Sequence, residues 1–172
     1  MNEDDPYDIQ VHHKHADDRV DPSMLQEGIR ETLRRFDQVS AEISVAVVTD
    51  AEIAELHEKY MNIKGATDVL TFDLAEQHHA GARAAGSIGF ARTNHCAGGR
   101  HVEGEIVVSA DTAKRRAEER AHPVAAELAL YVVHGTLHLL GMNDTTEQEA
   151  MKMHEMEDEI LATIGVGRIY GG

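Results

Sequence analysis

The segment HPVAAELALYVVHGTLHLLG, residues 122–141, constrains the fold of this chain more than any other. It carries Pro123 in its first turn and Gly141 at its end, positions that both residues commonly take in helices. Between them the segment is almost entirely apolar. A helix that is apolar on all sides has to be buried, so we expect the rest of the chain to pack around it.

The other segments show alternating strand and helix patterns. Strands are predicted near residues 7–13, 42–50, 67–74 and 104–111, and helices near residues 21–36, 50–62, 111–121 and 145–161. Asp21 is the predicted start of the first helix and Asp50 the predicted cap of the second. Thr146 and Glu149 match the capping box of the last helix. The stretch VAVV in the second strand suggests a sheet that is covered on both faces.

These patterns predict one α/β (α+β) domain over residues 1–172, with about four main strands and about five helices, and the apolar helix lying against the sheet. Residues 75–104 break the rhythm, because they are rich in glycine and alanine and lack a clear periodicity. We interpret them as a long loop or hairpin excursion, with a possible short strand near SIGFA.

Composition limits the kinds of partner. The formal net charge of −15 argues against non-specific coating of nucleic acid, which needs many Lys and Arg side chains, but it does not exclude an enzyme with a local nucleic-acid site. No apolar run approaches the roughly 20 residues that span a bilayer, so no membrane partner is expected. The single cysteine, Cys96, excludes an internal disulfide. We therefore expect a cytoplasmic protein.

The stretch HGTLHLLGMND, residues 134–144, has the spacing of a metal site. His134 and His138 lie four residues apart, so on a helix their rings share one face and can converge on one ion. Gly141 can take the left-handed conformation that ends the helix and turns the chain back, which lets Asp144 supply an oxygen ligand. Three protein ligands leave one position open for water, which is typical of catalytic zinc sites. We expect one Zn²⁺ per chain.

Two families share this pattern. The metzincin peptidases have HExxHxxGxxH, in which the glutamate activates water. The corresponding position here is Gly135, and this departure argues against a peptidase.

The second family is the YbeY endoribonucleases, which the chain resembles more closely. ELALYVVHGTLHLLGMND is similar to that family's HGxLHLxGYDH motif and the helix before it. GEIVVSADTAKRRAEE, TDVLTF and EISVAVVTDAEIAELHEKY resemble further segments of the family in the same order, so the similarity covers most of residues 43–161.

The resemblance implies a mixed sheet, a zincin-like metal helix and a metal-dependent endoribonuclease that cuts single-stranded RNA. It also implies a role in ribosomal RNA processing, at the 3′ end of the small-subunit RNA, and in ribosome quality control. The partners would be ribosomal RNA and the small ribosomal subunit, and the sequence leaves the oligomeric state open. By position, His134 and His138 match the first two metal ligands, and Asp144 stands where the family usually has its third histidine.

The chain also departs from the family in YMNIKGATDV, residues 60–69. The family usually has arginine directly after this tyrosine, and this chain has Met61. Lys64 is the nearest cation that could replace it in a catalytic role, although a point charge does not reproduce the arginine fork. The attacking group stays open between metal hydroxide and the 2′-hydroxyl of the RNA.

Two other functions remain possible from the sequence. A ribosome-assembly factor without catalytic activity would use the metal only to brace the fold, and a metzincin-like metallopeptidase is the less favoured alternative. His95, Cys96 and His101 form a second candidate metal cluster, which we interpret as exposed residues instead. The basic patch of the stretch AKRRAEER could contact RNA phosphates or could be a solvated face paired with neighbouring glutamates.

Overall fold

The computed structural model describes residues 5–14, 20–74 and 99–171. Its elements run in the order β1 (Tyr7–His13), α1 (Pro22–Arg35), β2 (Ser40–Val48), α2 (Asp50–Met61), β3 (Val69–Asp73), β4 (His101–Ser109), α4 (Ala110–Arg120), α5 (Val124–Leu139) and α6 (Glu147–Thr163). This order of strands and helices confirms the order predicted from the sequence.

The four described strands form one mixed sheet in the order β1-β2-β4-β3. β1, β2 and β4 run parallel to one another, and β3 pairs antiparallel with β4. The chain reaches β4 after β3, so β4 inserts between β2 and the antiparallel edge strand β3. The predicted fold class, an α/β (α+β) chain with a mixed sheet, is therefore confirmed.

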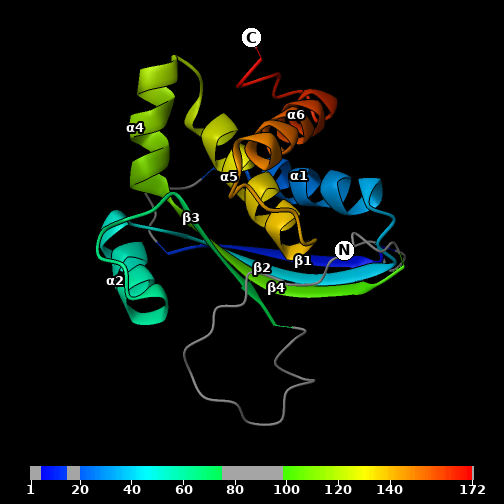
Figure 1. Ribbon diagram of the computed structural model, residues 1–172, viewed down its shortest axis with the longest axis horizontal. Coiled ribbons are helices and arrows are strands. Elements are labelled where there is room, and N and C mark those ends of the chain that lie inside the picture. The colour runs from blue at the N-terminus through cyan, green and yellow to red at the C-terminus, as the bar shows by residue number, and fades with distance from the viewer. Residues whose placement is uncertain (1–4, 15–19, 75–98, 172) are drawn as a thin grey trace.

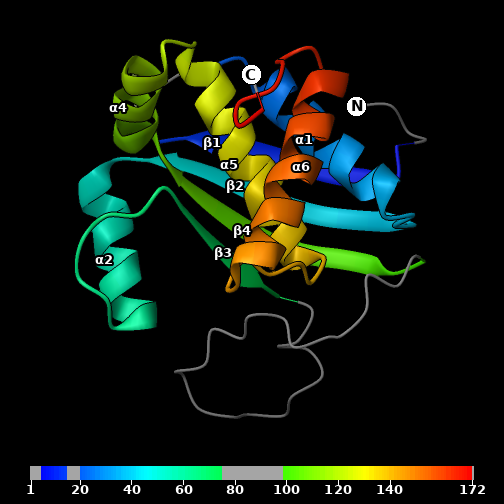
Figure 2. The same cartoon turned by 45° about the horizontal axis from the view of Figure 1, so that its top comes forward.

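The apolar helix α5 is the centre of the packing. Twelve of its sixteen residues are buried, which confirms that the rest of the chain packs around it. Figures 1 and 2 show α5 crossing one face of the sheet with α1 and α6 beside it. Two glycines allow close approach, because a Cβ on Gly28 would lie 3.2 Å from Val133 and one on Gly104 would lie 2.7 Å from Leu139.

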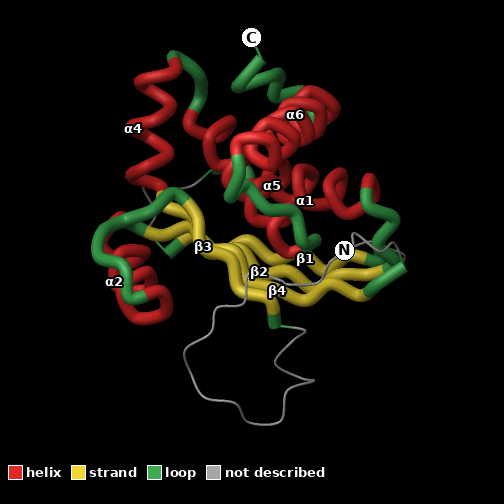
Figure 3. Tube along the Cα trace, viewed as in Figure 1, coloured by secondary structure: helices red, strands yellow, loops and turns green. Residues whose placement is uncertain are grey.

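The opposite face of the sheet is covered by α2. Val48, Ile53, Leu70 and Val107 form a separate apolar cluster on this side, with Phe72 and other residues packed around them. In Figure 3, α2 lies apart from α1, α5 and α6. The VAVV stretch of β2 thus meets apolar residues on both sides, as its composition suggested.

Several helix ends match the sequence and one differs. Asp21 caps α1, and Thr146 with Glu149 forms the predicted capping box of α6. The prediction that Asp50 caps α2 was wrong, because Thr49 is the cap and forms a capping box with Glu52. The carboxylate of Asp50 instead accepts hydrogen bonds from Thr112 and Arg115 of α4 and from Ser109, the residue before α4.

The Gly/Ala-rich excursion is also shorter than predicted at its C-terminal end. Residues 101–104 belong to β4, where they pair with residues 40–43 of β2. Residues 75–98, with the possible strand near SIGFA, lie outside the described residues. Within the described ranges, no helix is both long enough and apolar enough to cross a membrane.

Candidate metal site

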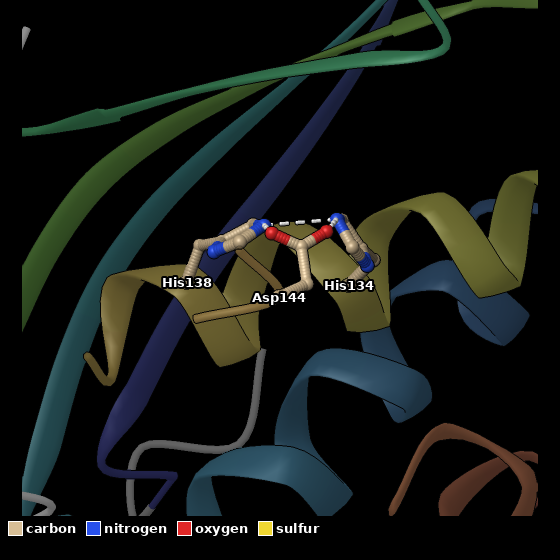
Figure 4. Close-up of side chains that lie close together, drawn as sticks. All are labelled: His134, His138 and Asp144. Carbon is tan, nitrogen blue, oxygen red and sulfur yellow. Dashed lines mark hydrogen bonds and ion pairs between the residues drawn. The ribbon is translucent and has the colours of Figure 1, made fainter. Parts of the chain in front are cut away.

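The last turn of α5 brings three possible metal ligands together. After the helix, Gly141 takes a left-handed conformation with φ of 89°. Its N–H donates to His138 O and the N–H of Met142 donates to Leu137 O, which is the Schellman pattern that reverses the chain at a helix end. The reversal returns Asp144 to the face that carries the two histidines. Ligand atoms of His134, His138 and Asp144 all lie within 4.8 Å of one another, as Figure 4 shows.

Each histidine is held through its Nδ1 atom. His134 Nδ1 donates to Glu157 Oε1 at 2.6 Å, and His138 Nδ1 donates to the carbonyl oxygen of Met142 at 2.9 Å. Carboxylate and carbonyl oxygens only accept hydrogen bonds, so each ring carries its proton on Nδ1 when it is neutral. The lone pairs are then on the two Nε2 atoms, which lie 2.9 Å apart. Two facing lone pairs at this distance repel each other unless a proton or a metal ion lies between them.

The distances fit a metal with this donor set. Two nitrogen ligands at about 2.0–2.1 Å from tetrahedral zinc would be roughly 3.3 Å apart. The Nε2 atoms are slightly closer than this, and the Asp144 oxygens lie 3.8 Å from His134 Nε2 and 4.0 Å from His138 Nε2. Asp144 is partly exposed, so small side-chain rotations close these gaps. Two imidazoles and one carboxylate therefore suit a zinc ion with an open position.

The surroundings shift the pKa values of the two rings in opposite directions. Burial works against the charged form of His134, but the hydrogen bond and charge of Glu157, with Asp144 and Asp68, outweigh it and raise the pKa of His134. Burial and the nearby charge of His134 lower the pKa of His138. The pair therefore favours a single added proton, held by His134.

Glu157 was missed by the sequence reasoning. It is fully buried on α6, and its second oxygen has no hydrogen-bond partner among the described residues. The signal was present in the sequence, because Met153, Ile160 and Leu161 place residue 157 on the buried face of the helix at i, i+3 and i+4 spacing. A glutamate on an apolar helix face needs a partner, and here that partner is His134, one of the three candidate metal ligands.

A cavity of about 340 Å³ opens beside the cluster. It is bounded by the three candidate ligands and by residues from the end of α2, the loop after it, β3 and the end of α5. Met61 lines this cavity, so the position of the family arginine does face the site. Of the residues that the structure describes, no lysine or arginine lines it.

Lys64 is not brought into the cavity. Its side chain is 87% exposed and its Nζ lies 3.9 Å from a Glu58 oxygen. Its neighbour Ile63 lines the cavity instead. The structure therefore joins three of the four residues singled out from the sequence, and Lys64 stands apart from them.

Gly135, at the position of the metzincin glutamate, faces the sheet. A Cβ there would lie 2.9 Å from Thr71 Oγ1 and 3.0 Å from a methyl of Ile106. A larger side chain would push α5 away from β3 and β4, so this position does not offer space for a carboxylate base.

The other candidates from the sequence do not form a second site in the described part of the chain. His101 lies in β4 with its Nδ1 2.8 Å from Ser40 Oγ, while His95 and Cys96 lie outside the described residues. The basic residues of α4 include three arginines that are paired with acids: Arg115 with Asp50, Arg116 with Glu119, and Arg120 with Glu127.

Comparison with known proteins identifies a family. The family model described as endoribonuclease YbeY matches residues 10–165. Curated proteins named endoribonuclease YbeY are similar to the chain: that of Moorella thermoacetica is 38% identical over 128 residues, covering 74% of this chain and 76% of the relative. That of Corynebacterium efficiens is 32% identical over 155 residues, covering 90% of this chain and 73% of the relative.

A solved structure shares the fold. The solution structure of TM1509 from Thermotoga maritima has a TM-score of 0.52 and 22% identity, and the match covers 91% of this chain and 90% of that one. The family model and the curated relatives each span most of the chain, and the chain belongs to the YbeY family of endoribonucleases.

Proposed function

We propose that this chain is a zinc-dependent endoribonuclease that cuts single-stranded RNA, with His134, His138 and Asp144 as the ligands of one Zn²⁺. We further propose that it acts in the cytoplasm on ribosomal RNA of the small subunit, at the 3′ end, and in ribosome quality control. The observation that carries the metal site is the pair of Nε2 atoms 2.9 Å apart, each on a ring whose Nδ1 is already engaged.

The residues of the chain have distinct parts in this proposal. Glu157 and the Met142 carbonyl hold the two imidazoles in the tautomer that points Nε2 at the ion. Asp144 adds a carboxylate and lowers the net charge of the centre. A zinc ion held there would polarise a phosphodiester oxygen and lower the pKa of water, the chemistry that hydrolysis of RNA requires. Because no lysine or arginine among the described residues lines the cavity, binding of the phosphate would depend on the metal.

The test is cleavage of purified small-subunit ribosomal RNA by tag-free protein, beside His138→Ala prepared identically. We expect cleavage by the unmodified protein and its loss in the variant, since the variant keeps only two ligands. His101→Ala is the matched control, because it removes a histidine outside the cavity. Equal cleavage by His138→Ala and the unmodified protein would identify a contaminating ribonuclease and reject the proposal.

Lys64→Ala belongs in the same experiment. Its exposed position predicts cleavage close to that of the unmodified protein, whereas a loss of tenfold or more would restore the catalytic role that the sequence suggested.

A ribosome-assembly factor without catalytic activity is the second candidate. The absence of a lysine or arginine from the cavity lining, within the described residues, favours it. In that case zinc would raise the melting temperature of the protein and His138→Ala would abolish this increase, with no cleavage by either protein. A peptidase is disfavoured by the packing of Gly135 against β3 and β4.

A further inference from the structure

The cavity beside the metal ligands is larger than the metal site needs. Its 340 Å³ lies at the lower end of the range for small-molecule sites, about 300–1,000 Å³. The metal ligands contribute only part of its wall. The remainder, which we name the side slot, is lined by Met61, Ile63, Asp68, Val69, Leu139 and Asn143, together with a few neighbours.

Most of the side slot is apolar. Met61, Ile63, Val69 and Leu139 supply its apolar wall. Ile63 is 51% exposed and lines the slot, so its side chain is accessible to a ligand. Enzymes that hold an unstacked nucleobase in a pocket place it between aromatic or apolar side chains, and methionine sulfur makes favourable contacts with aromatic rings. A flat base is a suitable occupant for this wall, and a phosphate is not.

The polar groups of the side slot select among bases. Asp68 Oδ1 accepts hydrogen bonds from Thr67 Oγ1 at 3.1 Å and from the N–H of Val69 at 2.9 Å, so the carboxylate is fixed at the start of β3. None of the hydrogen bonds within the described part of the chain uses Asp68 Oδ2. Asp68 lines the same cavity as His134 and His138.

A fixed carboxylate oxygen recognises hydrogen-bond donors. Guanine presents N1–H and an N2 amino group side by side on its Watson–Crick edge. Adenine and cytosine present one amino group on that edge, and uracil presents one imide N–H. We propose that the side slot binds the base next to the scissile phosphate and that Asp68 selects guanine there. The place at the scissile bond rests on the proposed nuclease function, whereas binding of the base does not.

Binding is tested first, with nucleosides that lack phosphate. Guanosine, inosine, adenosine, cytidine and uridine are titrated into the zinc-loaded protein, and binding is followed by NMR shifts of the methyl groups of Met61 and Ile63. We expect guanosine to bind about tenfold more tightly than inosine, which lacks the N2 amino group, and to shift these methyls. Equal binding of all five nucleosides, or shifts elsewhere, would overturn the proposal.

Asp68→Asn is the sharpest variant. Thr67 and Val69 donate to Oδ1, so they hold the amide oxygen in that position and place the amide nitrogen where Oδ2 was. The side chain keeps its size and its anchoring but becomes a donor toward the side slot. We expect guanosine affinity to fall about tenfold or more and uridine affinity to stay the same or rise. Unchanged guanosine affinity in Asp68→Asn would reject the role of Asp68.

Cleavage of short single-stranded RNAs then locates the slot relative to the cut. Replacing the guanosine beside the cut site by inosine should lower kcat/KM about tenfold in the unmodified protein and much less in Asp68→Asn. Cleavage without any guanosine preference would overturn this proposal while leaving the nuclease intact. Guanosine binding to both the unmodified protein and His138→Ala, with no cleavage by either, would reject the nuclease while supporting the side slot.

Discussion

A buried glutamate lies near each end of α5, Glu127 on α5 itself and Glu157 on α6. The two glutamates differ in the side chain that supplies the counter-charge. At the N-terminal end, Glu127 Oε1 accepts from Arg120 at 2.9 Å and lies 3.0 Å from His122 Nε2. At the C-terminal end, Glu157 Oε1 lies 2.6 Å from His134 Nδ1. Both glutamates are fully buried, and in both the second oxygen lacks a hydrogen-bond partner among the described residues.

The difference lies in the counter-charge. An arginine is always protonated, so Glu127 has its counter-charge whenever it is ionised. An imidazole becomes a cation only when it binds a proton. A metal ion bound to the neutral ring would bring positive charge to the same place. At the C-terminal end the counter-charge of Glu157 therefore depends on a proton or on an added ion, and a cavity opens beside this end. The comparison shows the same kind of buried carboxylate facing an arginine at one end of α5 and a candidate metal-ligand histidine at the other.

The largest expected effect is at the N-terminal end. Arg120→Ala leaves Glu127 charged and buried, which should lower the free energy of unfolding by about 2–3 kcal/mol, below the usual range for buried pairs because Arg120 is 36% exposed. Urea denaturation measures this loss. Arg116→Ala is the control, since its pair with Glu119 is exposed and should contribute less than about 1 kcal/mol.

The zinc affinity of Arg120→Ala should equal that of the unmodified protein. A loss of metal affinity as large as the loss of stability would show that the two ends of α5 are one coupled unit, and the comparison would fail.

Glu157→Gln should act mainly on the metal. Glutamine keeps the volume and can still accept from His134 Nδ1, but it removes the negative charge that makes this imidazole a stronger ligand. We expect zinc to bind about 10–100-fold more weakly, as measured by competition with a chelator. Glu127→Gln is the matched substitution at the other end of α5 and should leave zinc affinity unchanged. If both variants bind zinc like the unmodified protein, Glu157 has no part in the metal site.

A third carboxylate, that of Asp50, is expected to make a smaller contribution to stability. Asp50 accepts from Ser109, Thr112 and Arg115 and joins α2 to α4. Burial favours its neutral form, but these hydrogen bonds and the charge of Arg115 outweigh burial and lower the pKa of Asp50 below 3.8. The folded state thus prefers the ionised form, so this stabilisation is present above pH 3.8 and is lost as pH falls through the lower folded-state pKa.

Asp50→Asn should therefore be less stable than the unmodified protein by about 1 kcal/mol at pH 7, and the difference should shrink below pH 4. Chemical denaturation at pH 7, 5 and 3 gives the comparison. A difference that stays constant over this range would mean that the charge of Asp50 contributes nothing and that only its shape matters.

Much of the fold was predictable because local patterns and tertiary packing agree. The apolar segment 122–141 had to form a buried helix. The strands and helices alternate as the hydrophobic patterns of the sequence predict. The cap of α2 was mispredicted because Thr49 and Asp50 are both good capping residues. The Thr-x-x-Glu spacing of Thr49 and Glu52 is a local capping-box signal that favours Thr49. The hydrogen bonds of the Asp50 carboxylate to Ser109 and Arg115, about 60 residues away, could not be read from any local pattern.

The candidate site was predictable only along one stretch. His134, His138 and Asp144 lie within eleven residues, so helix geometry and one glycine sufficed to bring them together. Glu157 comes from a different helix, and its role depends on how α6 packs against α5. Lys64 was chosen because it is the nearest cation along the chain after Met61, the position of the missing arginine. Distance along the chain does not show that Ile63, and not Lys64, turns toward the cavity.

The packing of Gly135 has an evolutionary consequence. A mutation to glutamate at this position would place its Cβ against Thr71 and Ile106, and overpacking of this kind typically costs 1–3 kcal/mol. A lineage that started from this helix would lose stability before it gained a base for peptide hydrolysis. Compensating changes in β3 and β4 would have to come first, so this chain is separated from a site with a glutamate at position 135 by a barrier in its core as well as by its chemistry.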